Sequence, residues 1–144
     1  MISDNGPQIS EIEIIALEEK IGAEIPDEYR GFLLSNNGGR PEPDGVEVPG
    51  YDETDVQILF GLGRSIRSSC IDWNMESLRT RLPELAIPIA SDSGGNVFCL
   101  SIKKGSQGSV FYLDLNSVFG DDFKEAPMYE VSSTFVNFME SLFE

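Results

Sequence analysis

The feature that most constrains the fold is a pair of apolar runs joined by a short polar segment, IPIASDSGGNVFCLSI at residues 87–102. The joining segment, Ser91–Asn96, holds two hydroxyls, a carboxylate, an amide and two glycines. In turns, Asp and Ser side chains hydrogen-bond to nearby backbone, and glycine supplies positive φ. We therefore predict a turn between two antiparallel core strands, Ala86–Ala90 and Asn96–Ile102.

The same segment carries residue types found in catalytic sites, so that alternative needs a test. A serine nucleophile requires a base, and the chain contains no histidine. A phosphate-binding loop requires a helix after its glycines, whereas a strand is predicted here. An EF-hand loop needs acidic ligands at alternate positions and a glutamate at the twelfth, but Asp92 stands alone and Lys103 takes the twelfth place. The pattern favours a structural turn.

Two helices are predicted before the strands. Ser10 and Glu13 form a capping box, Gly22 is a C-terminal stop, and the helix between them carries an apolar stripe. The stripe consists of Ile14, Leu17 and Ile21. The second helix begins near Pro26 and ends at Asn36–Gly39, because Asn and Gly tolerate a left-handed cap. Its core face consists of Tyr29, Phe32 and Leu33. The short link between the helices predicts an αα-hairpin.

The remaining pattern predicts more strands and two further helices. The expected strands are Val56–Phe60, Ser109–Leu115 and Met128–Val131. A helix over 71–82 is expected to bury Trp73 and Leu78. A last helix, capped by Ser132 or Ser133, carries an apolar stripe. That stripe consists of Phe135, Phe138, Met139, Leu142 and Phe143. We predict an α+β fold, with a mainly antiparallel central sheet against which the helical hairpin and the C-terminal helix pack. A single domain is expected over 1–144, with residues 1–8 flexible.

The chain carries 25 acidic and 10 basic residues, a formal charge of −15. Such a field repels nucleic acids and anionic membranes and speeds association with basic partners, although acidity can also serve solubility alone. Cys70 and Cys99 are the only cysteines, so no disulfide framework is implied and a cytoplasmic location is expected. No apolar run is long enough to span a membrane, and the start MISDNGPQIS does not resemble a signal peptide.

An acidic stretch over 42–55 is the one feature with a functional interpretation. It has six acids and no base within a segment rich in Pro and Gly, and loops on a rigid scaffold often carry binding. The candidate partner-binding residues are Glu42, Asp44, Glu47, Asp52, Glu53 and Asp55. The alternative is an ordinary solvated connection.

No catalytic, cofactor or metal site is predicted. A second acidic segment resembles a metal-binding loop only loosely, because its spacing matches no ligand set. It consists of Asp114, Asn116, Asp121 and Asp122. Cys99 lies in an apolar strand, which favours a core residue. Cys70 has no activating neighbour beyond Arg67, which disfavours a reactive thiol.

The order of motifs resembles the SUKH superfamily, which includes fungal cell-wall synthesis regulators and many bacterial immunity proteins. The resemblance runs from about Ile9 to Phe143. It rests on three motifs: Ile25-Pro26-x-x-Tyr29-x-x-Phe32-Leu33 with Asn37-Gly38-Gly39, Ile87-Pro88-Ile89-Ala90 followed by Gly95-Asn96, and Ser133-Thr134-Phe135-x-x-Phe138-Met139. One departure is Leu113-Asp114, where many relatives carry a Trp-Asp-His-like run.

The resemblance implies a protein that binds and does not catalyse. Bacterial members are similar to antidotes that neutralise a cognate polymorphic or contact-delivered toxin. Many such toxins act on nucleic acids and are basic, which would suit an acidic partner. A regulatory or scaffold module of the same fold is the alternative. We expect a protein partner, no nucleic acid, no membrane, no cofactor and, by default, a monomer.

Overall fold

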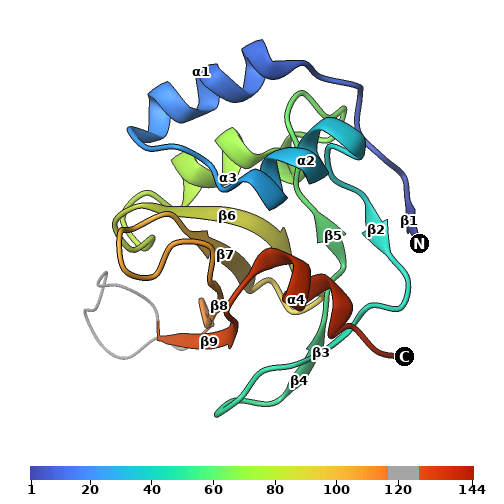
Figure 1. Cartoon of the computed structure of the whole chain (residues 1–144). Helices are drawn as coiled ribbons and strands as arrows, with labels where there is room; N and C mark the ends of the chain where they lie inside the picture. The colour runs from blue at the N-terminus through green and yellow to red at the C-terminus, as the bar shows by residue number, and fades with distance from the viewer. Residues whose placement is uncertain (117–126) are drawn as a thin grey trace.

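A five-stranded antiparallel sheet forms the centre of the structure, a computed structural model that describes residues 1–116 and 127–144 (Figure 1). Its strands lie in the order β5-β6-β7-β8-β9. Their bounds are β5 Ile58–Leu59, β6 Ala86–Ser91, β7 Val97–Ser101, β8 Val110–Leu113 and β9 Met128–Ser132. Each strand pairs with the next along the chain, so the predicted strands and turn are confirmed. The earlier metal candidates Asp121 and Asp122 lie outside the described residues.

Both faces of the sheet are covered at its centre, where every residue of β7 is buried. From one face, Phe98 contacts Phe138 with ring centroids 5.2 Å apart. From the opposite face, Val97 lines a hollow together with Trp73 and Leu78. Helices therefore lie on both sides of β7, which explains why Val97–Leu100 are all apolar and do not alternate with polar residues.

Pro88 lies in β6, between two neighbouring strands of the sheet. Proline has no N–H to donate to a strand ladder and is confined to edges and irregular positions. The β6–β7 register shifts between Pro88 and Ala90. The irregularity falls where the donor is missing, as expected for a proline inside a sheet.

The N-terminal helical pair is confirmed as α1 Glu11–Ile21 and α2 Asp27–Ser35. Ser10 and Glu13 form the predicted capping box, and Gly22 ends α1 at φ +86°. Glu18 joins the two helices, because its carboxylate accepts the Ile25 N–H at 2.8 Å and pairs with Arg30. Burial alone would raise the pKa of Glu18, but these hydrogen bonds and the Arg30 charge hold it below its ordinary value.

The other two helices are shorter than predicted: α3 Ile71–Ser77, preceded by the 3₁₀ turn η1 Arg67–Ser69, and α4 Phe135–Glu140. The expected burial of Trp73 is wrong, since it is 38% exposed, while Ile71 is buried instead. Thr134, not Ser132 or Ser133, caps α4, with its hydroxyl accepting the Asn137 N–H. Among the described residues, no helix combines the length and the apolar character that crossing a membrane requires.

Two parts of the chain contain short strands outside the central sheet. Residues 1–8 were expected to be flexible, yet β1 Ile2–Ser3 pairs with β2 Arg40–Pro41. Residues 40–53 were expected to form a loop, or a loop with a short edge strand, and β3 Gly45–Glu47 within them pairs with β4 Glu53–Asp55 to form a hairpin. It projects from the end of the molecule opposite α1 (Figure 1). Proline and glycine place the loops but leave room for two- and three-residue strands between them.

The base of this β3–β4 hairpin is fixed to the chain end that follows α4. The Gly45 N–H donates to the Phe143 carbonyl at 2.6 Å, and the Phe143 N–H donates back at 3.0 Å. A Cβ on residue 45 would lie 2.5 Å from the Phe143 oxygen. Only glycine permits this approach. Phe143, expected in the helical stripe, therefore lies beyond α4 and is 38% exposed.

Replacing Gly45 with alanine is expected to destabilise the protein by about 1–3 kcal/mol, because the methyl group separates two paired backbones. Gly31→Ala is the matched control. Residue 31 lies inside α2, with nothing within 4 Å of the added Cβ, so this change should stabilise by about 0.5–1 kcal/mol. Urea unfolding of both variants measures the difference. Equal effects would contradict the Gly45–Phe143 pairing.

The lowered pKa of Glu18 predicts a pH-dependent contribution. A carboxyl group whose folded-state pKa is depressed stabilises the fold above its ordinary value, here 4.5, and loses that contribution as pH falls through the folded-state pKa. Glu18→Gln should cost about 1–2 kcal/mol at pH 7. The gap to wild type should narrow below pH 4.5. Chemical unfolding across pH tests this, with exposed Glu19→Gln expected to show no such gap.

Candidate functional site

The structure brings part of the acidic stretch together on the β3–β4 hairpin. Glu47 and Glu53 lie directly opposite each other across its two strands. Asp52 lies in the turn that joins them, and all three side chains are exposed. Glu42 and Asp44 precede the hairpin and are exposed as well. We call Glu47, Asp52 and Glu53 the acidic tip.

In the described part of the chain, no basic side chain forms an ion pair with the acidic tip. Among residues 1–116 and 127–144, the ion pairs lie elsewhere, on α1–α2, near the N-terminus and on α3. Like charges directly opposite across an antiparallel pair are destabilising. The hairpin therefore presents a negative surface that the described part of the chain does not neutralise.

Asp55, another of the candidate partner-binding residues, makes internal hydrogen bonds. Its side chain is partly buried, and it accepts hydrogen bonds from both the N–H (2.9 Å) and the hydroxyl of Ser93. Ser93 belongs to the turn between β6 and β7. Asp55 is thus committed to an internal contact that ties the hairpin to this turn.

Asp92 makes the second connection between the hairpin and the turn that joins β6 to β7. This residue is 4% exposed. Its Oδ1 atom accepts the backbone N–H groups of Gly94 (3.0 Å) and Asn96 (2.8 Å). Its Oδ2 atom accepts the hydroxyl of Thr54 in β4 (2.8 Å) and that of Tyr112 in β8. One carboxylate therefore shapes the turn and joins the hairpin to the sheet.

Asn96 extends the same network. Its amide nitrogen donates to the Tyr112 hydroxyl at 2.7 Å, and its oxygen accepts the Leu115 N–H (2.7 Å) and the Asn116 amide (3.0 Å). Burial, together with the bond to Asp92, raises the pKa of Tyr112. The hydroxyl consequently stays protonated and serves as a donor. The turn interpretation of Ser91–Asn96 agrees with this arrangement.

Tyr51 lies at the hairpin turn, beside the acidic tip, and sequence reasoning did not single it out. Its ring lies against Tyr112 and Tyr129, with centroids 5.1 and 5.2 Å apart. The residue as a whole remains 41% exposed. A shallow hollow of about 510 Å³ lies beside it, lined by Tyr51, Asp52, Glu53, Thr54, Asp55, Asp92, Ser93, Gly94, Asn96, Tyr112 and Asn116.

Acidic clusters and the two cysteines are the remaining candidates for metal or thiol chemistry. In the described part of the chain, no group of three acidic or cysteine side chains is placed to hold a metal ion. Both cysteines are buried, and burial raises the pKa of the Cys99 thiol. The Cys70 sulfur contacts the carbonyls of Arg64 and Ile66. Neither thiol is presented as a nucleophile.

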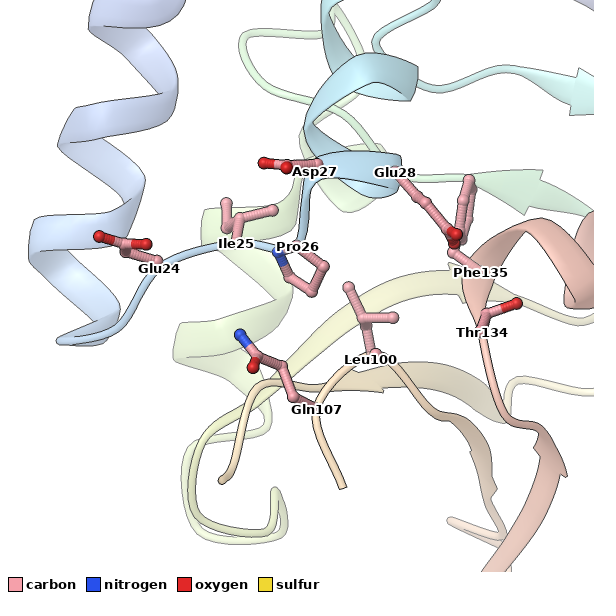
Figure 2. Close-up of a pocket in the computed structure, with 10 residues that line it drawn as sticks. Glu24, Ile25, Pro26, Asp27, Glu28, Leu100, Gln107, Thr134 and Phe135 are labelled. Carbon is pink, nitrogen blue, oxygen red and sulfur yellow. The ribbon is translucent and has the colours of Figure 1, made fainter. Parts of the chain in front are cut away.

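A second hollow, of about 450 Å³, lies where α2 and α4 begin (Figure 2). Figure 2 shows Leu100 and Phe135 at its wall, with the carboxylates of Glu24 and Asp27 pointing away from them. Glu28 turns toward α4, where it accepts the Val136 N–H at 3.2 Å. Its acids therefore cap a helix or face outward, so this hollow offers a ligand no convergent charge.

Comparison with known proteins agrees with the fold. The family model described as the SMI1 / KNR4 family (SUKH-1) matches residues 8–141. A curated relative, the SPbeta prophage-derived uncharacterized protein YokK of Bacillus subtilis (strain 168), is 29% identical over 108 residues. The match covers 62% of this chain and 55% of the relative, so the chain spans about half the length of that protein. The family match covers most of the chain, including the sheet, all four described α-helices and the β3–β4 hairpin, and the protein belongs to the SMI1 / KNR4 (SUKH-1) family.

Proposed function

We propose that the protein is a cytoplasmic immunity protein of a bacterial polymorphic or contact-delivered toxin system, and that it binds and neutralises a cognate basic toxin of the nuclease type. The observation that carries the proposal is the acidic tip, exposed and without a cation in the described chain. Neutralisation would occur by covering the toxin's active or substrate-binding surface. No step of this mechanism requires catalysis.

Electrostatics supports a basic partner. The formal charge of −15 speeds encounter with a basic surface, and complementary charges then select the correct orientation. Glu47 and Glu53 repel each other in the free protein. A cationic partner removes that repulsion on binding, so part of the affinity comes from relief of a cost that the unbound hairpin carries.

Rigidity supports the same role. A flexible loop would lose conformational entropy on binding, whereas an ordered one has already lost it on folding. The hairpin is held at its base by Gly45 and along β4 by Thr54 and Asp55. The acidic tip is therefore pre-organised for a partner.

Family membership supports a protein-binding role, and the prophage origin in the name of the Bacillus relative is in keeping with mobile-element competition. The alternative is a regulatory or scaffold module that binds a cellular protein without a toxin. Gene position separates the two: a toxin gene immediately upstream favours immunity. Co-purification with the products of neighbouring genes, followed by a toxicity-rescue assay in cells, tests the proposal directly. A toxin that co-purifies but is not neutralised would contradict it.

Reversing the acidic tip with Glu47→Lys, Asp52→Lys and Glu53→Lys should slow association with the toxin at least about tenfold at low salt. The deficit should shrink as salt rises, because screening shortens the reach of surface charge to about 10 Å at 0.1 M. Stopped-flow or surface-based kinetics across salt concentrations measures this.

The matched control reverses three exposed acids away from the hairpin, Glu19, Glu84 and Glu140. It changes net charge by the same amount. An equal loss of association rate in both variants would show that only total charge matters and that the acidic tip is not the contact.

Removing the hydrogen bonds that Asp92 accepts should increase the local opening of the β3–β4 hairpin. Asp92→Asn places an amide where Thr54 and Tyr112 donate, and Thr54→Val removes one donor. We expect the first change to cost about 1–3 kcal/mol and both to speed amide exchange in β3 and β4 more than in β7. Hydrogen exchange read by NMR measures it, with exposed Asp72→Asn as control. Unchanged exchange in the hairpin would contradict the tie.

A further inference from the structure

Tyr51 is an exposed aromatic ring whose surroundings are acidic. It lies at the end of a turn in which its N–H donates to the Val48 carbonyl (3.0 Å) and the Val48 N–H donates to the Asp52 carbonyl (3.0 Å). Gly50, at φ +82°, permits this turn. The backbone therefore fixes where the ring begins, and the next two residues along the chain are Asp52 and Glu53.

The ring is also fixed from beneath. Tyr112 and Tyr129, from β8 and β9, support it at centroid distances of 5.1 and 5.2 Å. Tyr112 is in turn held by Asp92 and Asn96. Tyr51 is 41% exposed, and its supported ring has little conformational freedom left to lose when a ligand covers it.

The charges beside the ring indicate what would cover it. The hollow next to Tyr51 is lined by Asp52 and Glu53. The Glu53 N–H donates to Asp52 Oδ1 at 2.7 Å, which orients that carboxylate. A cation is attracted to the face of an aromatic ring and pairs with a carboxylate at the same time.

Of the two basic side chains, the guanidinium group fits this arrangement better. It is planar, so it stacks on a ring, and its fixed fork of donors binds carboxylates in pairs. An ammonium group is a compact point charge that holds its water more strongly. A ring that shares a hollow with two carboxylates is therefore expected to favour arginine over lysine.

We propose that Tyr51, with Asp52 and Glu53, forms a receptor for an arginine side chain of the protein partner. The proposal rests on the proposed function for the identity of that partner, and it adds the residue chemistry that the hairpin recognises. The aromatic ring supplies a surface that the arginine side chain would cover, while the carboxylates supply the charge.

The probe is a short, blocked peptide with two arginines separated by glycine, compared with versions carrying lysine or the neutral analogue citrulline. NMR titration of the full chain should show saturable shifts at Tyr51 with the arginine peptide. We expect lysine to bind about threefold or more weakly and citrulline to show no saturation.

Variants separate the ring from the charge. Tyr51→Phe keeps the ring and should change arginine-peptide affinity less than about twofold, whereas Tyr51→Leu should weaken it about threefold to thirtyfold. Asp52→Asn with Glu53→Gln should weaken binding and flatten its salt dependence. The matched control, Glu19→Gln with Glu140→Gln, removes equal charge from exposed positions elsewhere and should bind as wild type. Amide spectra verify folding. If Tyr51→Leu does not fold, the affinities of Tyr51→Phe and of Asp52→Asn with Glu53→Gln test the proposal instead.

The proposal is overturned if lysine and arginine peptides bind equally, if Tyr51→Leu binds as wild type, or if the control loses as much affinity as the hairpin variant. Failure here is distinct from failure of the proposed function. A toxin that loses affinity on reversal of the acidic tip but not on Tyr51→Leu overturns the arginine receptor alone. Arginine-selective binding at Tyr51 in a protein that rescues no toxin supports the receptor and overturns the immunity role.

Discussion

The arrangement of the hairpin depends on one buried carboxylate. Asp92 uses one oxygen to close the turn between β6 and β7 and the other to hold Thr54 and Tyr112. A buried charge is costly unless hydrogen bonds satisfy it, and here four donors do so. Two of these bonds stay within the turn, the third comes from Tyr112 in β8, and the fourth, from Thr54, connects the turn to β4. The hairpin is thereby fixed to the core although it contributes little apolar area of its own.

This connection explains how the protein tolerates an unfavourable surface. A two-stranded hairpin is marginal in water by itself, and the opposed Glu47 and Glu53 weaken it further. Val46 and Val48 are buried and anchor its inner side, while Gly45, Thr54 and Asp55 bond to the body. The acids are thereby kept in fixed positions at a cost that the contacts on the inner side offset.

The sequence allowed much of the fold to be predicted, because helices and core strands are governed by local caps and periodicity. The capping box at Ser10 and the apolar runs flanking Ser91–Asn96 are signals of this kind. The arrangement of the candidate site was harder to predict from the sequence than the fold. Asp55 bonds to Ser93, and Thr54 bonds to Asp92, and in each pair the partners lie 38 positions apart in the sequence. No local sequence pattern predicts contacts over such a separation. Trp73 was expected inside because it is large and apolar, yet Ile71 takes the core position in α3.

The separation of core from surface on the hairpin has a consequence for recognition. Val46 and Thr54 face the body, whereas Glu47 and Glu53 are exposed, because side chains alternate along a strand. Each exposed residue can therefore change without altering the contacts that hold the hairpin. Tyr51 is the exception, since its ring both packs on Tyr112 and Tyr129 and remains accessible. A residue that belongs to both the support and the surface is the one through which a bound partner would contact the sheet most directly.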